Sequence, residues 1–288
     1  MDVVLFILLG TAIGVFSGFF GIGGGIILTP FLLLLGFPST LVIGTSLMLS
    51  LGASISGAIS HFRMKNIQWR YVIVINILGI IGTQIAHPLV LKLESFGYAE
   101  TAISIFYMIL LGFFAFTLLR KRKVDGMKKP SSIHPMVIAS LIGLGAGFIS
   151  STLGVSGSFF IVPLLISLLG FNTPHAVGTS LASVFFIIST GLITYSLSSP
   201  LNYLIGISLI IGTFIGSPIG AKATTLLKES SMRKLLGILY VCMIISVITK
   251  IFSLSFIGLM IIGLFTAVFF TILVRKKLQL KKQRAPET

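Results

Sequence analysis

The chain has 288 residues, of which 55% are hydrophobic and only 9% are charged, and its formal net charge is +15. Since a soluble domain carries about a quarter charged residues, this composition excludes a water-soluble protein and predicts one embedded in a lipid bilayer. Nucleic acid is not an expected partner, because the lysines and arginines fall mainly in connecting loops and the tail. We expect these basic loops to contact anionic lipids instead.

Apolar runs between charged and turn residues predict the membrane segments. In chain order they are 3–20, 26–36, 40–62, 71–91, 99–119, 136–153, 158–170, 175–197, 201–221, 235–249 and 255–274. Two of them, 26–36 and 158–170, are too short to cross a bilayer, because at 1.5 Å per residue they reach only about 16 to 20 Å. We predict that each forms a half-helix or re-entrant arm, paired with the longer segment before it as a broken helix.

An internal repeat relates the two short segments. The stretch GVFSGFFGIGGGIILTPFLLLLGFPSTLVIGTSL at 14–47 resembles GFISSTLGVSGSFFIVPLLISLLGFNTPHAVGTSL at 147–181. The residues that match at an offset of 133, and at 134 after one inserted residue, are Gly14/Gly147, Gly21/Gly154, Gly24/Gly157, Pro30/Pro163, Gly36/Gly170, the Gly-Thr-Ser-Leu runs from Gly44 and Gly178, Gly57/Gly191 and Gly82/Gly216. A constant offset over so long a stretch indicates duplication.

Charge placement predicts the orientation of the two halves. The strongest basic clusters, 120–129 and the tail from Arg275, should both be cytoplasmic. With five segments per half, the basic loop 222–234 is inside and the uncharged loop 198–200 is outside. The basic loop 63–70, which is the repeat equivalent of loop 198–200, is inside. The halves are then oppositely oriented and the N-terminus is outside. Four parallel segments per half would place the basic tail outside, against the charge rule.

The predicted fold is therefore an all-α, polytopic transmembrane bundle of two inverted-topology repeats and a final helix, a construction common in secondary transporters. The expected parts are a first repeat at 1–120, a basic cytoplasmic linker at 121–134, a second repeat at 135–254, a last transmembrane helix at 255–274 and a basic cytoplasmic tail at 275–288.

Each broken helix contains a glycine-rich break that is suited to binding an anion. A helix beginning at such a break presents free N–H groups and a partial positive charge. The expected ligands are amides of Gly23, Gly24, Gly25 and Ile26 in the first half and of Ser156, Gly157, Ser158 and Phe159 in the second. The alternative is that these glycines serve only a tight turn and close packing. No strand precedes them and no Gly-Lys-Ser or Gly-Lys-Thr follows, so a dinucleotide or phosphate loop is excluded.

Hydroxyl pairs and glycine stripes occur in the long segments. Thr45 with Ser46, and Thr179 with Ser180, lie early in two equivalent segments and can either bind substrate or join helices by hydrogen bonds. Two stripes of glycines spaced four residues apart, Gly10, Gly14 and Gly18 and then Gly212, Gly216 and Gly220, predict close helix packing.

Titratable residues are scarce within the segments. The carboxylates all lie at segment ends, in loops or in tails: Asp2, Glu94, Glu100, Asp125, Glu229 and Glu287. A buried carboxylate relay is therefore not expected. His87, which precedes Pro88, is the best candidate for a proton-responsive residue, with a packed helix-end histidine as the alternative.

The remaining polar residues of the segments are expected to face protein or the interface. Asn76 and Gln84 are costly in lipid, so each should join helices or line a pathway. His61 lies at a segment end and is interpreted as interfacial, while Lys222 and Lys250 lie near segment ends, where their long side chains can reach the interface.

The sequence does not favour an enzyme. A catalytic site at membrane depth would need a nucleophile or a metal set, yet no histidine lies near Cys242 in the sequence and no His-xx-Glu or His-Glu-xx-His pattern occurs. With one cysteine, neither a disulfide nor a cysteine metal site can form, and we expect no metal and no cofactor.

The duplicated motif also resembles a known family. GVFSGFFGIGGGIILTPFLLLLG followed by GTSL, and GFISSTLGVSGSFFIVPLLISLLG followed by GTSL, are similar to the TauE/SafE family of sulfite and organosulfur anion exporters over about residues 3–274. The resemblance implies a bacterial or archaeal plasma-membrane permease for small sulfur-containing anions such as sulfite or sulfonates. Ser156 and Ser158 replace Gly23 and Gly25 of the first half, so the two half-sites need not contribute equally.

Together these features predict a secondary transporter that exports a small anion by alternating access. The glycine breaks supply the sign of the substrate, and the family resemblance supplies sulfur. An anion channel with the same site, or a structural membrane protein, is the alternative.

Overall fold

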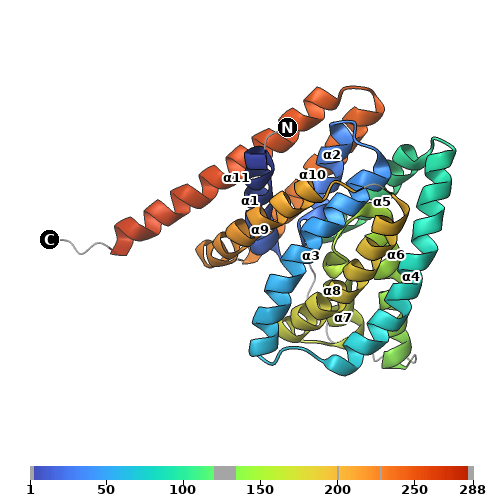
Figure 1. Cartoon of the computed structure of the whole chain (residues 1–288). Helices are drawn as coiled ribbons and strands as arrows, with labels where there is room; N and C mark the ends of the chain where they lie inside the picture. Colours follow the sequence, from blue (N-terminus) through green and yellow to red (C-terminus); the bar gives the residue numbers. More distant parts are fainter. Residues whose placement is uncertain (1–2, 120–133, 200, 228, 285–288) are drawn as a thin grey trace.

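The computed structural model describes residues 3–119, 134–199, 201–227 and 229–284, and every regular element in them is helical (Figure 1). The predicted linker 121–134, all but its last residue, and the end of the tail from 285 lie outside the described residues. The helices are α1 (Val3–Phe20), α2 (Gly25–Leu34), α3 (Ser39–Arg63), α4 (Trp69–Ser95), α5 (Ala99–Leu119), α6 (Pro135–Leu153), α7 (Ser158–Leu169), α8 (Thr173–Ser198), α9 (Tyr203–Ala223), the 3-10 turn η1 (Thr224–Leu226), α10 (Glu229–Ile251) and α11 (Ser255–Arg284).

Nine of the described helices are long and apolar enough to cross a membrane, and α2 and α7 are not, as the sequence predicts. The largest differences from the predicted segments are at α10 and α11. Charged residues end the apolar runs in the sequence, but lysine, arginine, leucine and glutamine are good helix formers, so a charge does not end a helix. For this reason α11 continues through Arg284, and Figure 1 shows it extending beyond the bundle.

Glycine stripes bring two pairs of helices into close contact. A Cβ added to Gly18 of α1 would overlap the backbone of Ser217 in α9, and one added to Gly220 of α9 would overlap Val15 of α1. The close packing predicted for these stripes is therefore confirmed. The pair α4 and α6 repeats this arrangement, because a Cβ on Gly147 would overlap the backbone of Gly79. The small residues allow backbones to meet where a side chain would hold them apart.

The helix contacts of the two halves correspond. The repeat relates α1 to α6 and α4 to α9, so the pairs α1–α9 and α4–α6 occupy equivalent places. Likewise α3 packs against α8, α5 against α10, and the short helices α2 and α7 against α3 and α8. The direction of each half relative to a membrane stays a prediction.

Apolar side chains also cover the outside of the bundle. On α5, Ile105, Ile109 and Phe113 are 46%, 66% and 64% exposed. A soluble protein rarely exposes so continuous an apolar face, whereas lipid tails cover it at no cost. The last helix docks differently, through Phe269, whose ring centroid lies 4.4 Å from that of Phe16 in α1.

Candidate functional site

The helix breaks require glycine at particular positions. Between α1 and α2, Gly21 and Gly23 have φ values of 68° and 73°, and Gly154 after α6 has 66°. These left-handed conformations cost an L-residue with a Cβ about 1–2 kcal/mol, whereas glycine adopts them freely. The glycines thus end α1 and α6 and let α2 and α7 begin in new directions.

The two breaks contact each other in the interior of the bundle. A Cβ added to Gly23 would overlap the Ser156 Cβ and lie 2.8 Å from the Ser156 Oγ. A Cβ on Gly25 would lie 2.9 Å from the Val155 Cα. Thr29 Oγ1 also donates to the Leu153 carbonyl at 2.9 Å, which ties α2 to the end of α6. Both short helices therefore begin at one buried place, although the breaks are more than 100 residues apart in the sequence.

The first turns of α2 and α7 carry backbone donors. The Gly25 N–H donates to Ser50 Oγ at 3.2 Å, and the Ser158 N–H approaches Ser156 Oγ at 3.4 Å. In the described part of the chain, the N–H groups of Ile26, Gly157 and Phe159 have no hydrogen-bond acceptor. Free amides and the positive ends of two helix dipoles favour negative charge at this junction.

The predicted hydroxyl residues differ in how they are used. Thr179 Oγ1 accepts the Gln68 N–H at 3.1 Å, so it is engaged within the protein. Thr45, Ser46 and Ser180 are at most 1% exposed, and no described residue bonds their hydroxyls. An unpaired buried polar group costs about 1–3 kcal/mol, so any partner that these three hydroxyls gained would lower the free energy of the protein.

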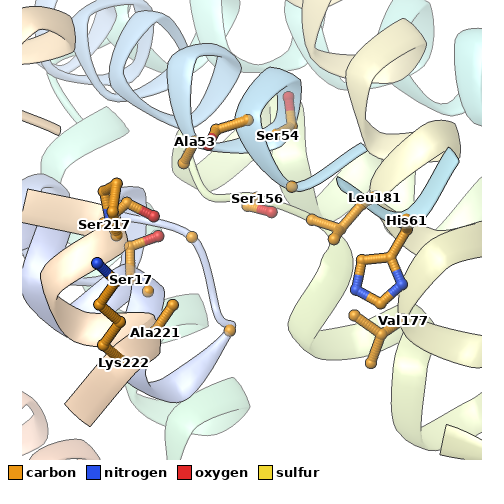
Figure 2. Close-up of a pocket in the computed structure, with 16 residues that line it drawn as sticks. Ser17, Ala53, Ser54, His61, Ser156, Val177, Leu181, Ser217, Ala221 and Lys222 are labelled. Carbon is orange, nitrogen blue, oxygen red and sulfur yellow. The ribbon is translucent and has the colours of Figure 1, made fainter. Parts of the chain in front are cut away.

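A cavity of about 450 Å³ leads to the junction (Figure 2). Buried Gly23 and Ser156 line its inner end, and exposed Ala221 and Lys222 line its mouth. Of the predicted ligands, only Gly23 and Ser156 reach it. The lining residues are Ser17, Gly18, Gly21, Gly23, Ala53, Ser54, Ser56, Gly57, His61, Ser156, Val177, Leu181, Ser217, Pro218, Ala221 and Lys222.

The cavity walls are basic. Figure 2 shows Lys222 on the wall formed by α1 and α9, near Ser17 and Ser217, and His61 on the opposite wall beside Val177. Of the described lining residues, none is Asp or Glu. The positive charge of Lys222 and the hydroxyls of the lining serines are features that favour an anion over a cation.

Sequence reasoning missed these two basic residues by placing both at the interface. The sequence did contain a sign that these residues could line a site. His61 lies one helical turn after Gly57, which the repeat pairs with Gly191, and Lys222 lies two residues after Gly220, which belongs to a glycine stripe.

Comparison with known proteins agrees with the geometry. A protein-family model described as "Sulfite exporter TauE/SafE" matches residues 6–247. The chain belongs to this family. It is similar to YdhB of Bacillus subtilis, a probable membrane transporter protein, at 28% identity over 229 residues, or 78% of this chain and 92% of that protein. A probable membrane transporter protein of Haemophilus influenzae is 27% identical over 269 residues, covering 86% and 98% of the two chains. No solved structure matches. The family match, the transporter relatives and the long apolar helices together show that this chain is a multi-pass membrane transporter.

In this TauE/SafE chain, His87, Gln84 and Asn76 lie away from the cavity. His87 Nε2 lies 2.7 Å from Ser198 Oγ, and Gln84 Nε2 donates to Thr194 Oγ1 at 2.9 Å, so both residues join α4 to α8. The Asn76 side chain is buried, and its Oδ1 has no partner among the described residues.

Lys250 is a third basic residue that the sequence placed at the interface. Its ammonium donates to the Leu33 carbonyl in the last turn of α2 and lies 3.1 Å from Glu100 Oε1, and its side chain is only 10% exposed. A cation at the C-terminal end of a helix complements the helix dipole, so Lys250 stabilises the C-terminus of the short helix α2. At the other end, Tyr107 donates its hydroxyl to the Ile26 carbonyl.

Proposed function

We propose that this transporter moves a small anion, specifically sulfite or an organosulfonate, out of the cell across the plasma membrane by alternating access. The observation that carries the proposal is the cavity with basic walls that ends where two half-helix N-termini meet. Membership in the TauE/SafE family supports sulfur in the substrate.

Binding is assigned to three sets of groups. Lys222 attracts the anion into the cavity, because an opposite charge at its mouth lowers the free energy of the bound anion, and His61 on the opposite wall can donate a ring N–H to it. Ser156 and the amides at the junction take its oxygens. Thr45, Ser46 and Ser180 are buried and do not line the cavity, and their unpaired hydroxyls would bond the anion as the junction rearranges around it.

The proposed orientation follows the positive charge. Arg63, Lys65 and Arg70 surround the α3–α4 connection, and Lys222 lies in the last turn of α9. Under the positive-inside rule both ends are cytoplasmic, so the cavity faces the cytoplasm and the C-terminus is inside, with the N-terminus outside. Opposite orientation of the halves then allows them to exchange conformations and expose the junction to either side.

Vesicle transport tests the proposal. Purified protein is reconstituted, the vesicles are loaded with sulfite, an alkyl sulfonate or sulfoacetate, and efflux is followed against protein-free vesicles. We expect saturable sulfite or sulfonate efflux that external substrate accelerates by exchange. Efflux that neither saturates nor shows exchange would assign the chain to anion channels. No flux of any of these anions above protein-free vesicles would refute the proposal.

A charge variant tests the cavity itself. Lys222→Gln should raise the substrate KM about fivefold to tenfold, since a charge-assisted contact in a partly open site is worth about 1 kcal/mol or slightly more. Lys234→Gln is the matched control, because Lys234 is exposed and does not line the cavity. Equal KM values for the two variants would remove Lys222 from the binding site.

A further inference from the structure

The sequence repeat assigns a counterpart to each residue that lines the cavity. At offsets of 133 or 134 the pairs include Ser17/Ser150, Gly18/Ser151, His61/Tyr195, Ser217/Thr83, Pro218/Gln84 and Ala221/His87. Helix starts follow the same offset, since α3 and α4 begin at Ser39 and Trp69 and α8 and α9 at Thr173 and Tyr203. The counterparts therefore lie at equivalent positions of α6, α8 and α4.

In contrast to the cavity, this second set of residues is closed by direct contacts. Tyr195 is 0% exposed, and its hydroxyl donates to the Ser151 carbonyl at 2.8 Å, which joins α8 to α6. His87 lies 2.7 Å from Ser198 Oγ, which joins α4 to α8. The His87 ring also meets the Tyr195 ring edge-on, with centroids 4.7 Å apart. Gln84 adds its hydrogen bond to Thr194 on the same pair of helices.

The difference between the two sets lies in the side chains and their partners. Where the cavity has Ala221, too small to cross to the facing helix, its counterpart His87 reaches α8. The cavity has His61, whose one side-chain hydrogen-bond partner in the described part of the chain is Asn66, at 3.4 Å. Its counterpart Tyr195 instead reaches the end of α6, beside the second glycine break.

Polar groups also line the closed set. Ser150, Ser151 and Thr83 are buried there, and the Ser151 hydroxyl has no partner among the described residues. Opening these contacts would uncover hydroxyls beside the break at Gly154, an environment suited to the same anion. The closed set thus carries hydroxyls like those of the open cavity, although Pro88 occupies the position that Lys222 has in the cavity.

We propose that Tyr195 and His87 are the closing residues of an outer gate. Their contacts hold α4, α6 and α8 together, and breaking them opens a chamber around Thr83 and Ser151 to the extracellular side while the cytoplasmic cavity closes. Neither residue touches the anion in the closed state, so both are positioning residues. This inference rests on the alternating-access part of the proposed function.

Thiol labelling tests the gate in the whole protein. On a Cys242→Ser background, Ser217→Cys reports on the cavity and Thr83→Cys, its repeat counterpart, reports on the closed chamber. An impermeant thiol reagent is applied to right-side-out or inside-out membrane vesicles. With the gate intact, Ser217→Cys should react from the cytoplasmic side and Thr83→Cys should be protected from outside.

Gate variants should reverse that pattern. Tyr195→Phe with His87→Leu should increase labelling of Thr83→Cys from outside about thirtyfold and decrease labelling of Ser217→Cys from inside, because two hydrogen bonds of about 1 kcal/mol each favour the closed state. Tyr203→Phe, at an exposed tyrosine, is the control and should change neither. Ser198→Ala, which removes only the partner of His87, and Tyr195→Phe alone are milder variants that should give the same pattern if the double variant fails to fold.

The labelling separates this inference from the substrate. Unchanged labelling of Thr83→Cys in all gate variants, with anion efflux present, would refute the gate and leave the proposed function standing. Increased outside labelling with no flux of any tested anion would keep the gate and refute the proposed substrate. Labelling of Thr83→Cys from outside in the intact protein would also overturn the gate.

Discussion

The contact between the two helix breaks predicts a specific coupling between Gly23 and Ser156. Gly23→Ala introduces two costs. Its φ of 73° strains any residue with a Cβ, by about 1–2 kcal/mol. The new methyl group would also overlap the Ser156 Cβ and lie 2.8 Å from its Oγ, whereas non-bonded carbon atoms stay about 3.5–4.0 Å apart. Overpacking of this kind costs about 1–3 kcal/mol, so the total loss of stability should be about 2–5 kcal/mol.

A matched glycine separates the two costs. Gly21 has a φ of 68°, and a Cβ added there meets nothing within 4 Å. Gly21→Ala should therefore lose only the backbone term of about 1–2 kcal/mol. In the double variant Gly23→Ala with Ser156→Gly, the methyl group would lie 3.6 Å from the Cα of residue 156, an ordinary contact. The steric term should then disappear, which gives a favourable coupling of about 1–3 kcal/mol between the two substitutions.

The assay is the thermal midpoint of the detergent-purified protein, followed as the monodisperse fraction that survives heating. Each kcal/mol should shift the midpoint by about 2–4 °C in a chain of this size. The midpoint should fall further for Gly23→Ala than for Gly21→Ala, and Ser156→Gly should restore part of the difference. Additive effects of Gly23→Ala and Ser156→Gly would refute the contact between the breaks, and with it the single junction on which the site depends.

Three further substitutions test the framework around the junction, each by the same thermal assay. Gly147→Ala should lower the stability by about 1–3 kcal/mol, because its Cβ would overlap the α4 backbone. Gly112→Ala is the control and should not lower the stability, since its Cβ meets nothing within 4 Å. Equal shifts of the midpoint for the two variants would contradict the glycine contact. Thr29→Val should cost about 1–3 kcal/mol of stability, because it leaves the buried Leu153 carbonyl at the end of α6 unpaired. Thr117→Val, at an exposed hydroxyl, is the control and should have little effect. An unchanged midpoint for Thr29→Val would argue against the hydrogen bond between Thr29 and Leu153. Lys250→Met keeps the apolar stem but removes the cation at the end of α2, so it should lower the midpoint by the equivalent of about 1 kcal/mol, and an unchanged midpoint would show that the cation does not stabilise this half-helix.

Much of the fold could be predicted because its causes are local. The bilayer requires every backbone polar group to be satisfied within its own segment, so long apolar runs are helices and their positions can be read directly. The short runs that became α2 and α7 were identified by length alone. The breaks at Gly21 to Gly25 and at Gly154 to Gly157 were identified because only glycine tolerates such a backbone and because both halves repeat it.

The membership of the site was predicted less well. Gly23 and Ser156 were expected and do line the cavity, but Lys222 and His61 were interpreted as interfacial. A basic residue near a helix end looks the same in the sequence whether it reaches the membrane surface or a cavity. The helix packing distinguishes the two, because it is the approach of α9 and α3 around the end of α1 that creates the space these side chains face.

The sequence by itself determined that this protein is an all-helical membrane protein built from two related halves with a glycine break in each. Only the tertiary structure decided which distant groups meet. It gave Thr179 a partner in Gln68 and left Thr45, Ser46 and Ser180 without one, and it closed His87 against Tyr195 and Ser198. Apolar periodicity and backbone strain are properties of neighbouring residues, whereas these contacts join residues more than 100 positions apart and depend on how whole helices pack.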